Sequence, residues 1–97
     1  MKQIERIKQM EECMDRVSQS LTQLSVALDN YESTLPLLNK LDKYYGNDLW
    51  KQDFADDEAG HLPITLKRGV LSEDGVWNLL NDNRNLIERM RALIGSI

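Results

Sequence analysis

Hydrophobic residues in the first third of the chain recur at alternating steps of three and four positions. This heptad spacing is typical of a helix that presents one narrow apolar line to a neighbour, as in a coiled coil. From Ile4 to Tyr31 it predicts a single helix about 42 Å long, at roughly 1.5 Å per residue. The residues on this line, called here the N-terminal seam, are Ile7, Met10, Met14, Val17, Leu21, Leu24, Leu28 and Tyr31.

The apolar spacing continues beyond Tyr31 and across Pro36. A proline inside a helix removes one backbone hydrogen bond and collides with the preceding turn. Either the helix kinks and continues, or it ends near Tyr31 and restarts with Ser33 or Thr34 as its N-cap, which puts Pro36 in the tolerated first turn. The restart is the favoured interpretation. Gly46 is then expected to end the apolar face as a C-cap glycine.

The middle of the chain predicts a short helix followed by an irregular segment. Asn47 or Asp48 can cap the short helix, and Gly60 can end it. The irregular segment is too apolar for a free loop, so we expect it to pack across the helices. Its apolar residues are Leu62, Ile64, Leu66, Val70 and Leu71.

The last helix is expected to start at a Ser72 cap and to run to about Ile94, with Glu73 and Asp74 in its first turn complementing the helix dipole. Its apolar stripe is wider than the N-terminal seam, which predicts contact with two neighbours. The stripe has a central line of Val76, Leu80, Asn83, Ile87, Met90 and Ile94, and an edge of Leu79, Leu86 and Leu93.

Together these patterns predict an all-α fold in a single helical domain over residues 1–97. The long N-terminal helix packs antiparallel on the C-terminal helix, as in a helical bundle or a coiled-coil-like hairpin. One or two shorter helices and an irregular crossing segment lie between them. On the last helix, Asn83 is either a hydrogen-bonded core amide or a polar residue that fixes register or oligomer state.

Composition narrows the class of protein. The net charge of −4 argues against nonspecific binding to nucleic acid or to an anionic membrane, because both require a cationic surface. The first twelve residues have no secretory-signal pattern, and no apolar run approaches the roughly 18–20 residues that cross a bilayer. The single cysteine, Cys13, fits a reducing compartment. We therefore expect a cytoplasmic protein.

No group of residues in the sequence suggests catalysis or a cofactor. His61 has no serine or cysteine nucleophile motif beside it, and Cys13 is expected to act as a small hydrophobe. The acids Asp56, Asp57 and Glu58 are consecutive, whereas a calcium loop alternates its ligands. We therefore predict neither an enzyme nor a metal site.

Two clusters are candidates for a binding site. Tyr44, Tyr45, Trp50 and Phe54 form either the core under the middle segment or a patch that binds a partner.

The second cluster is the stretch "LKRGVLSEDGVW", residues 66–77. Lys67 and Arg68 are expected to pair with Glu73, Asp74 or the acids at 53–58; alternatively they hold an anion at the Ser72 helix start. Gly75 is expected to make room for a close neighbour, such as an aromatic ring.

The stretches "YYGNDLWKQDF", "DEAGHLPITLKRGVLSEDGVWNLL" and "DNRNLIERM" resemble a small bacterial family catalogued as a domain of unknown function, number 4298. The resemblance covers nearly the whole chain and is most specific over residues 44–90. It implies a mostly helical, cytoplasmic, stand-alone bacterial domain, and it implies no reaction. The matching residues are Tyr44, Tyr45, Gly46, Trp50, Asp53, Gly60, Pro63, Lys67, Arg68, Gly69, Leu71, Ser72, Asp74, Gly75 and Asn83.

Two functions follow as hypotheses. The first is a non-enzymatic helical module that binds a protein partner or a second copy of itself through the N-terminal seam, because the last helix is too short to cover that seam. The second is a small-ligand or anion site. Its candidate residues are Tyr44, Tyr45, Trp50, Asp53, Lys67, Arg68, Ser72, Asp74 and Gly75.

Overall fold

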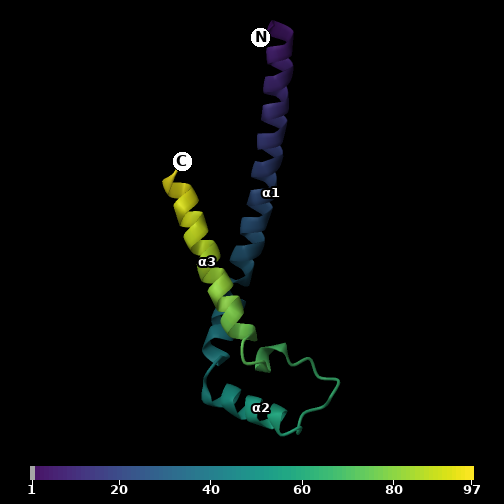
Figure 1. Ribbon diagram of the computed structural model, residues 1–97, viewed down its shortest axis with the longest axis vertical. Coiled ribbons are helices and arrows are strands. Elements are labelled where there is room, and N and C mark those ends of the chain that lie inside the picture. The colour runs from purple at the N-terminus through teal and green to yellow at the C-terminus, as the bar shows by residue number, and fades with distance from the viewer. Residues whose placement is uncertain (1) are drawn as a thin grey trace. The chain divides into compact units, whose positions relative to one another are not determined.

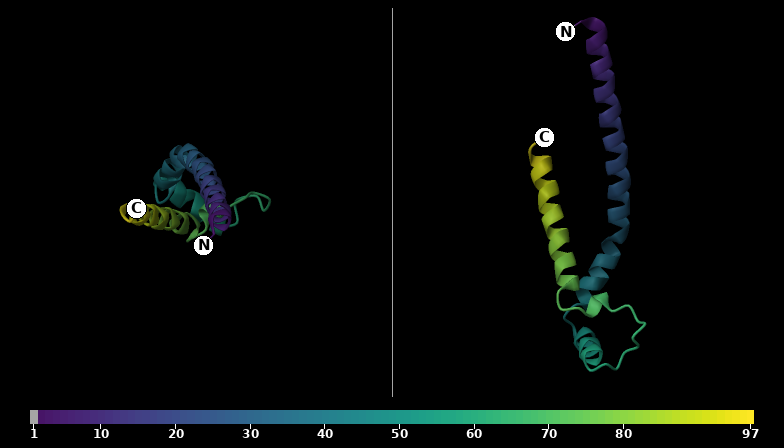
Figure 2. Two further views of the ribbon diagram at one scale, coloured as in Figure 1. Left: turned by 90° about the horizontal axis from the view of Figure 1, so that it is seen from above. Right: turned by 45° about the vertical axis from the view of Figure 1, so that its right-hand side comes forward.

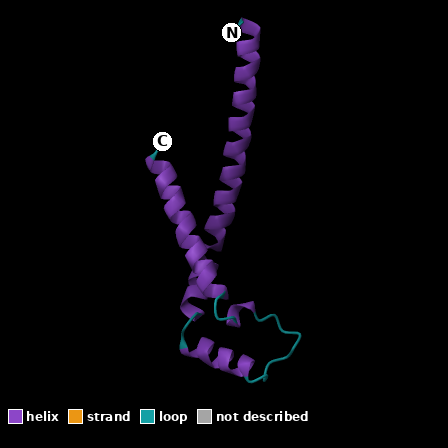
Figure 3. Cartoon of the chain, in the orientation of Figure 1, coloured by secondary structure: helices purple, strands orange, loops and turns teal. Residues whose placement is uncertain are grey.

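The computed structural model describes residues 2–97, which are helical apart from short connections (Figures 1 and 3). Helix α1 covers Gln3–Tyr44, α2 covers Asp48–Glu58 and α3 covers Gly75–Gly95. A short 3₁₀ helix, η1, covers Gly69–Leu71. The described residues contain no β-strand, so the all-α prediction is confirmed.

The chain divides into two compact units at Leu35 and Pro36. The first unit is the greater part of α1. The second unit, Pro36–Ile97, holds the last turns of α1 together with α2, η1 and α3. Each unit is described by itself.

Helix α1 continues through Pro36, so the predicted restart after Tyr31 is wrong. The hydroxyls of Ser33 and Thr34 do not cap a new helix. They donate instead to the carbonyl oxygens of Asn30 and Tyr31, both at 2.7 Å, which is the pattern of such residues inside a helix. Only one backbone donor is lost at the proline, and the helical bonds on either side maintain the helix.

A glycine with positive φ follows each of the first two helices, Gly46 after α1 and Gly60 after α2. After α1 the backbone turns at Gly46, whose φ of +80° suits glycine, as the C-cap prediction required. The Asn47 side chain then caps α2 by accepting a hydrogen bond from the Trp50 amide at 2.9 Å. At the far end, His61 N–H donates to the Asp56 carbonyl and Gly60 N–H to that of Asp57, a Schellman motif.

The core of the second unit is small and lies where η1 meets the start of α3. Leu71 and Val76 are 5% and 3% exposed. Leu80 and Ile87 of the predicted central line of α3 line a groove together with Leu38 of α1, whereas Ile94 of that line is 70% exposed. Within this unit the last turns of α1 and helix α3 run in opposite directions (Figure 2).

The crossing segment is less buried than its composition predicts. Leu62 is half-buried, but Ile64 is 91% exposed and Leu66 is 49% exposed, so their predicted packing across the helices is wrong. A turn closed by the Leu66 amide on the Pro63 carbonyl, at 3.1 Å, directs this part of the loop outward. The segment returns to the core only at Leu71.

Helix α3 begins at Gly75, so the prediction that Glu73 and Asp74 form its first turn is wrong. Residues 72–74 form a turn that continues from η1, in which the Ser72 amide donates to the Gly69 carbonyl at 3.3 Å. The first α-helical bond runs from the Asn78 amide to the Asp74 carbonyl at 2.8 Å. Asp74 is the N-cap by position, but its side chain makes no capping bond.

Candidate interaction site

Three aromatic side chains lie together and connect α2 to η1 and to the turn that follows α1. The Trp50 ring stacks on Phe54 with centroids 5.2 Å apart and meets Tyr45 edge-on at 5.1 Å. Its indole N–H donates to the Val70 carbonyl of η1 at 2.9 Å. Because all three rings are half-buried and engaged, this cluster serves the packing of the unit.

Tyr44 joins the end of α1 to α2. Its hydroxyl donates to an Asp53 carboxylate oxygen at 2.5 Å, a short, charge-assisted hydrogen bond. This bond to Asp53, with burial and the negative charge of the same carboxylate, raises the pKa of Tyr44 to about 12. The tyrosine therefore stays a neutral donor throughout the neutral range. Its neighbour Tyr45 makes a longer bond of 3.5 Å to the Glu73 carbonyl.

The two basic residues of the "LKRG" stretch, Lys67 and Arg68, have different environments in the structure. The Arg68 guanidinium lies 2.6 Å from the Asp57 carboxylate, which confirms the predicted internal pairing for Arg68. Both side chains are partly shielded from solvent, and the pair ties the loop end to α2. Lys67 is exposed, and among residues 2–97 no ion pair involves it.

Ser72 and Gly75 close the turn before α3. The Ser72 hydroxyl donates to the Gly69 carbonyl at 2.9 Å and accepts from the Gly75 amide at 3.0 Å. A Cβ atom on Gly75 would lie against the Ser72 hydroxyl and 2.7 Å from the Gly69 carbonyl oxygen. The predicted close neighbour of Gly75 is confirmed, although it is the backbone of η1 and not an aromatic ring.

A shallow, mainly apolar groove of about 440 Å³ opens beside this turn. Among the described residues, Lys67 is the only charged one that lines this groove. The sequence placed Lys67 and Gly75 near each other, but it gave no sign of the groove's other walls, because these come from three elements that meet only on folding. The lining residues are Leu41, Lys67, Gly69, Val70, Gly75, Val76 and Leu79.

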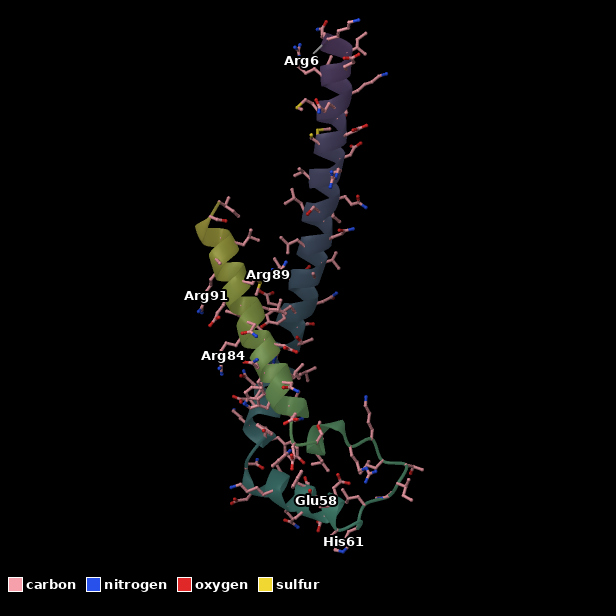
Figure 4. All side chains as sticks on the ribbon, viewed as in Figure 1. Arg6, Glu58, His61, Arg84, Arg89 and Arg91 are labelled. Carbon is pink, nitrogen blue, oxygen red and sulfur yellow. The ribbon has the colours of Figure 1, made fainter. Side chains whose placement is uncertain are left out.

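The N-terminal seam is the largest exposed apolar feature of the first unit. Its residues from Ile7 to Leu28 are each between 46% and 62% exposed, and Cys13 beside them is exposed too. Figure 4 shows side chains projecting from α1 along its whole length. No residue within Gln3–Tyr44 is buried. On α3, the edge residues Leu79, Leu86 and Leu93 are also about half exposed.

His61 and the acids of α2 are the other candidate site residues. His61 lies at the surface of the second unit, 3.5 Å from the Asp56 carboxylate (Figure 4). Within residues 2–97, no three His, Cys, Asp or Glu side chains are grouped as a metal site would require. Nor does any helix in that range have the length and apolar character needed to cross a membrane.

Comparison with known proteins identifies the family to which the chain is similar. The model of the family described as Domain of unknown function (DUF4298) matches residues 7–93. No curated protein and no solved structure matches the chain.

Proposed function

The chain belongs to the family described as Domain of unknown function (DUF4298), and from its geometry we propose that it is a non-enzymatic helical protein–protein interaction module. The second unit is a small scaffold, and the first unit presents the N-terminal seam to a helix of another polypeptide. The proposal includes a bacterial, cytoplasmic setting, which rests on the family resemblance.

The exposed seam is the observation that carries this proposal. Apolar residues at heptad spacing continue for about four heptads, from Ile7 to Leu35, and a pattern of that length is typical of a helix that pairs with another. An exposed apolar strip of this kind marks an interaction surface.

Helix length supports the same conclusion. Helix α1 has 42 residues and is about 63 Å long, whereas α3 has 21 residues and is about 32 Å long. Since α3 is half as long as α1, it can lie beside no more than about half of α1. We propose that a helix of another polypeptide covers the seam on the rest.

The hypothesis of an anion site at the start of α3 gains no support from the contacts. Arg68 is engaged by Asp57, and the Ser72 hydroxyl uses both its donor and its acceptor within its own turn. An anion would have to displace these bonds and would face the carboxylates of Glu73 and Asp74.

Affinity purification from the native host tests the proposal if it compares seam and outward-facing variants. We expect the wild-type chain and Gln23→Glu to capture the same polypeptide, and Leu24→Glu to lose it, because only Leu24 lies on the seam. Urea unfolding, monitored by tryptophan fluorescence, checks the second unit. Equal unfolding midpoints for the two variants would show that this unit is intact in both. Equal capture by both variants contradicts the proposal.

A further inference from the structure

We infer that the partner on the seam is a second copy of the same chain, bound as a parallel, in-register coiled coil over residues 3–35. This inference rests on the proposed function and names the partner of that same surface. It is argued from the heptad positions, from the charges beside the seam and from the small residues that flank it.

The heptad positions follow directly from the seam. Ile7, Met14, Leu21 and Leu28 take position a, and Met10, Val17, Leu24 and Tyr31 take position d. In a parallel, in-register pair each of these residues meets its own counterpart, so every layer of the interface is apolar. All of these residues lie within one uninterrupted part of α1.

The flanking charges favour the parallel orientation. Arg6 takes position g and Glu11 takes position e of the next heptad, which are the positions that face each other across a parallel coiled coil. A dimer would thus form two Arg6–Glu11 ion pairs, one on each side. Both side chains are exposed, and neither forms an ion pair among residues 2–97.

The antiparallel alternatives lack this complementarity, because e then faces e and g faces g. Aligning the seams fully places Arg6 near Thr34 and Glu11 near Ser25, with no ion pair. Sliding one helix by a heptad places Glu11 opposite Glu32, where like charges repel. Of these arrangements only the parallel one gains an attraction between charges.

The other flanking positions place no charge beside the centre of the seam. Between Glu11 and Glu32 the e and g residues are small, so two helices can approach closely there without desolvating a charge. These residues are Cys13, Ser18, Ser20, Ser25 and Ala27.

Disulfide trapping and sedimentation of the full chain test the inference. In a Cys13→Ser background, Leu24→Cys places a thiol at a d position, where a parallel, in-register dimer brings the two copies together. Gln23→Cys, one residue away at an outward position, is the matched control. Under mild oxidation we expect the first variant to form a covalent dimer at least ten times faster than the second.

Charge reversal supplies a second readout that does not depend on a cysteine. By sedimentation, Glu11→Arg should weaken the dimer roughly three- to tenfold, because two attractions become repulsions. Adding Arg6→Glu should restore wild-type affinity. The antiparallel arrangements predict no such rescue.

The possible outcomes separate this inference from the proposed function. A wild-type chain that remains a monomer at all concentrations, while still capturing another polypeptide through the seam, overturns the inference and leaves the proposed function standing. A dimer in which positions 23 and 24 cross-link equally overturns the parallel, in-register arrangement. Rapid cross-linking at 24 together with rescue by the charge swap supports it.

Discussion

Gly75→Ala is the substitution whose effect the structure defines most sharply. The added methyl group would lie 2.7 Å from the Gly69 carbonyl oxygen and against the Ser72 hydroxyl. The hydroxyl can rotate away, but the carbonyl belongs to η1 and is held by its own bonds, because it accepts from both the Ser72 amide and the Ser72 hydroxyl. The turn before α3 therefore has to shift.

Three contributions determine how much Gly75→Ala changes the free energy of unfolding. Alanine in place of glycine favours a helix by up to about 1 kcal/mol, and by less at its first residue. Forcing a methyl group into a filled site costs about 1–3 kcal/mol. Disturbing the two Ser72 hydrogen bonds costs about 0.5–1.5 kcal/mol each. The steric and hydrogen-bond costs together exceed the helix gain, so we expect a net loss of at least about 1 kcal/mol in the free energy of unfolding.

Urea unfolding followed by tryptophan fluorescence measures this loss, because Trp50 and Trp77 both lie in the second unit. Gly95→Ala is the matched control, since it makes the same change at the other end of α3, where nothing lies within 4 Å of the added methyl group. We expect the control to be neutral or slightly stabilising.

Two results would refute the reasoning about Gly75. One is a Gly75→Ala variant as stable as Gly95→Ala, which would mean that the turn relaxes freely. The other is full recovery on adding Ser72→Ala, which would assign the clash to the hydroxyl alone and not to the Gly69 carbonyl.

Three further contacts of the second unit can be tested by substitution with the same urea assay. Tyr44→Phe should cost about 1 kcal/mol at pH 7. The pKa of tyrosine is near 10 in the unfolded chain, and that of Tyr44 in the folded chain is about 12. The bond to Asp53 therefore loses its stabilising effect as the pH rises from 10 to 12. In a pH series, the difference in the free energy of unfolding between wild type and Tyr44→Phe should shrink over that range. Asn47→Ala removes the α2 cap and should cost about 0.5–2 kcal/mol, whereas Asn47→Asp should be nearly neutral. For Arg68 and Asp57, a double-mutant cycle with alanine should give a coupling of about 0.5–1 kcal/mol that falls in high salt, and zero coupling would contradict the pairing.

The helices were predictable because their signals are local. Heptad spacing identifies α1, and Asn47 with Gly60 marks the limits of α2. These signals depend on residues within one or two turns of each other, so the sequence contains them in full.

The errors arise where local signals compete. Ser33 and Thr34 are good caps before a proline, and they are also able to bond back into an existing helix. Whether the helix continues or restarts depends on how much stability a continuous apolar register on both sides of Pro36 adds. That stability depends on the whole helix and not on the residues beside the proline. Similarly, Ile64 looks like a core residue by type, but its burial depends on where the loop around it turns.

The candidate site was predictable only in part. The acids at 53–58 indicated a partner for Arg68, and the structure selects Asp57 among them. The groove beside Lys67 could not be foreseen, because Leu41 and Leu79 are far apart in sequence and form its walls only when α3 meets the end of α1.

Pro36 has a consequence for how the chain behaves without the proposed partner. No residue in the range 2–35 is buried, so the helical state of the first unit depends on intrinsic propensity, and several serines and β-branched residues lower that propensity. Without apolar cover on the seam, amides in this unit should exchange with deuterium quickly.

Because proline has no amide hydrogen, the ladder of helical bonds is interrupted at Pro36, beside the boundary between the units. Unwinding that starts near the N-terminus therefore meets a natural stopping point there. We expect slow exchange to persist beyond it, so that association and helix formation are coupled in the first unit while the second unit stays folded.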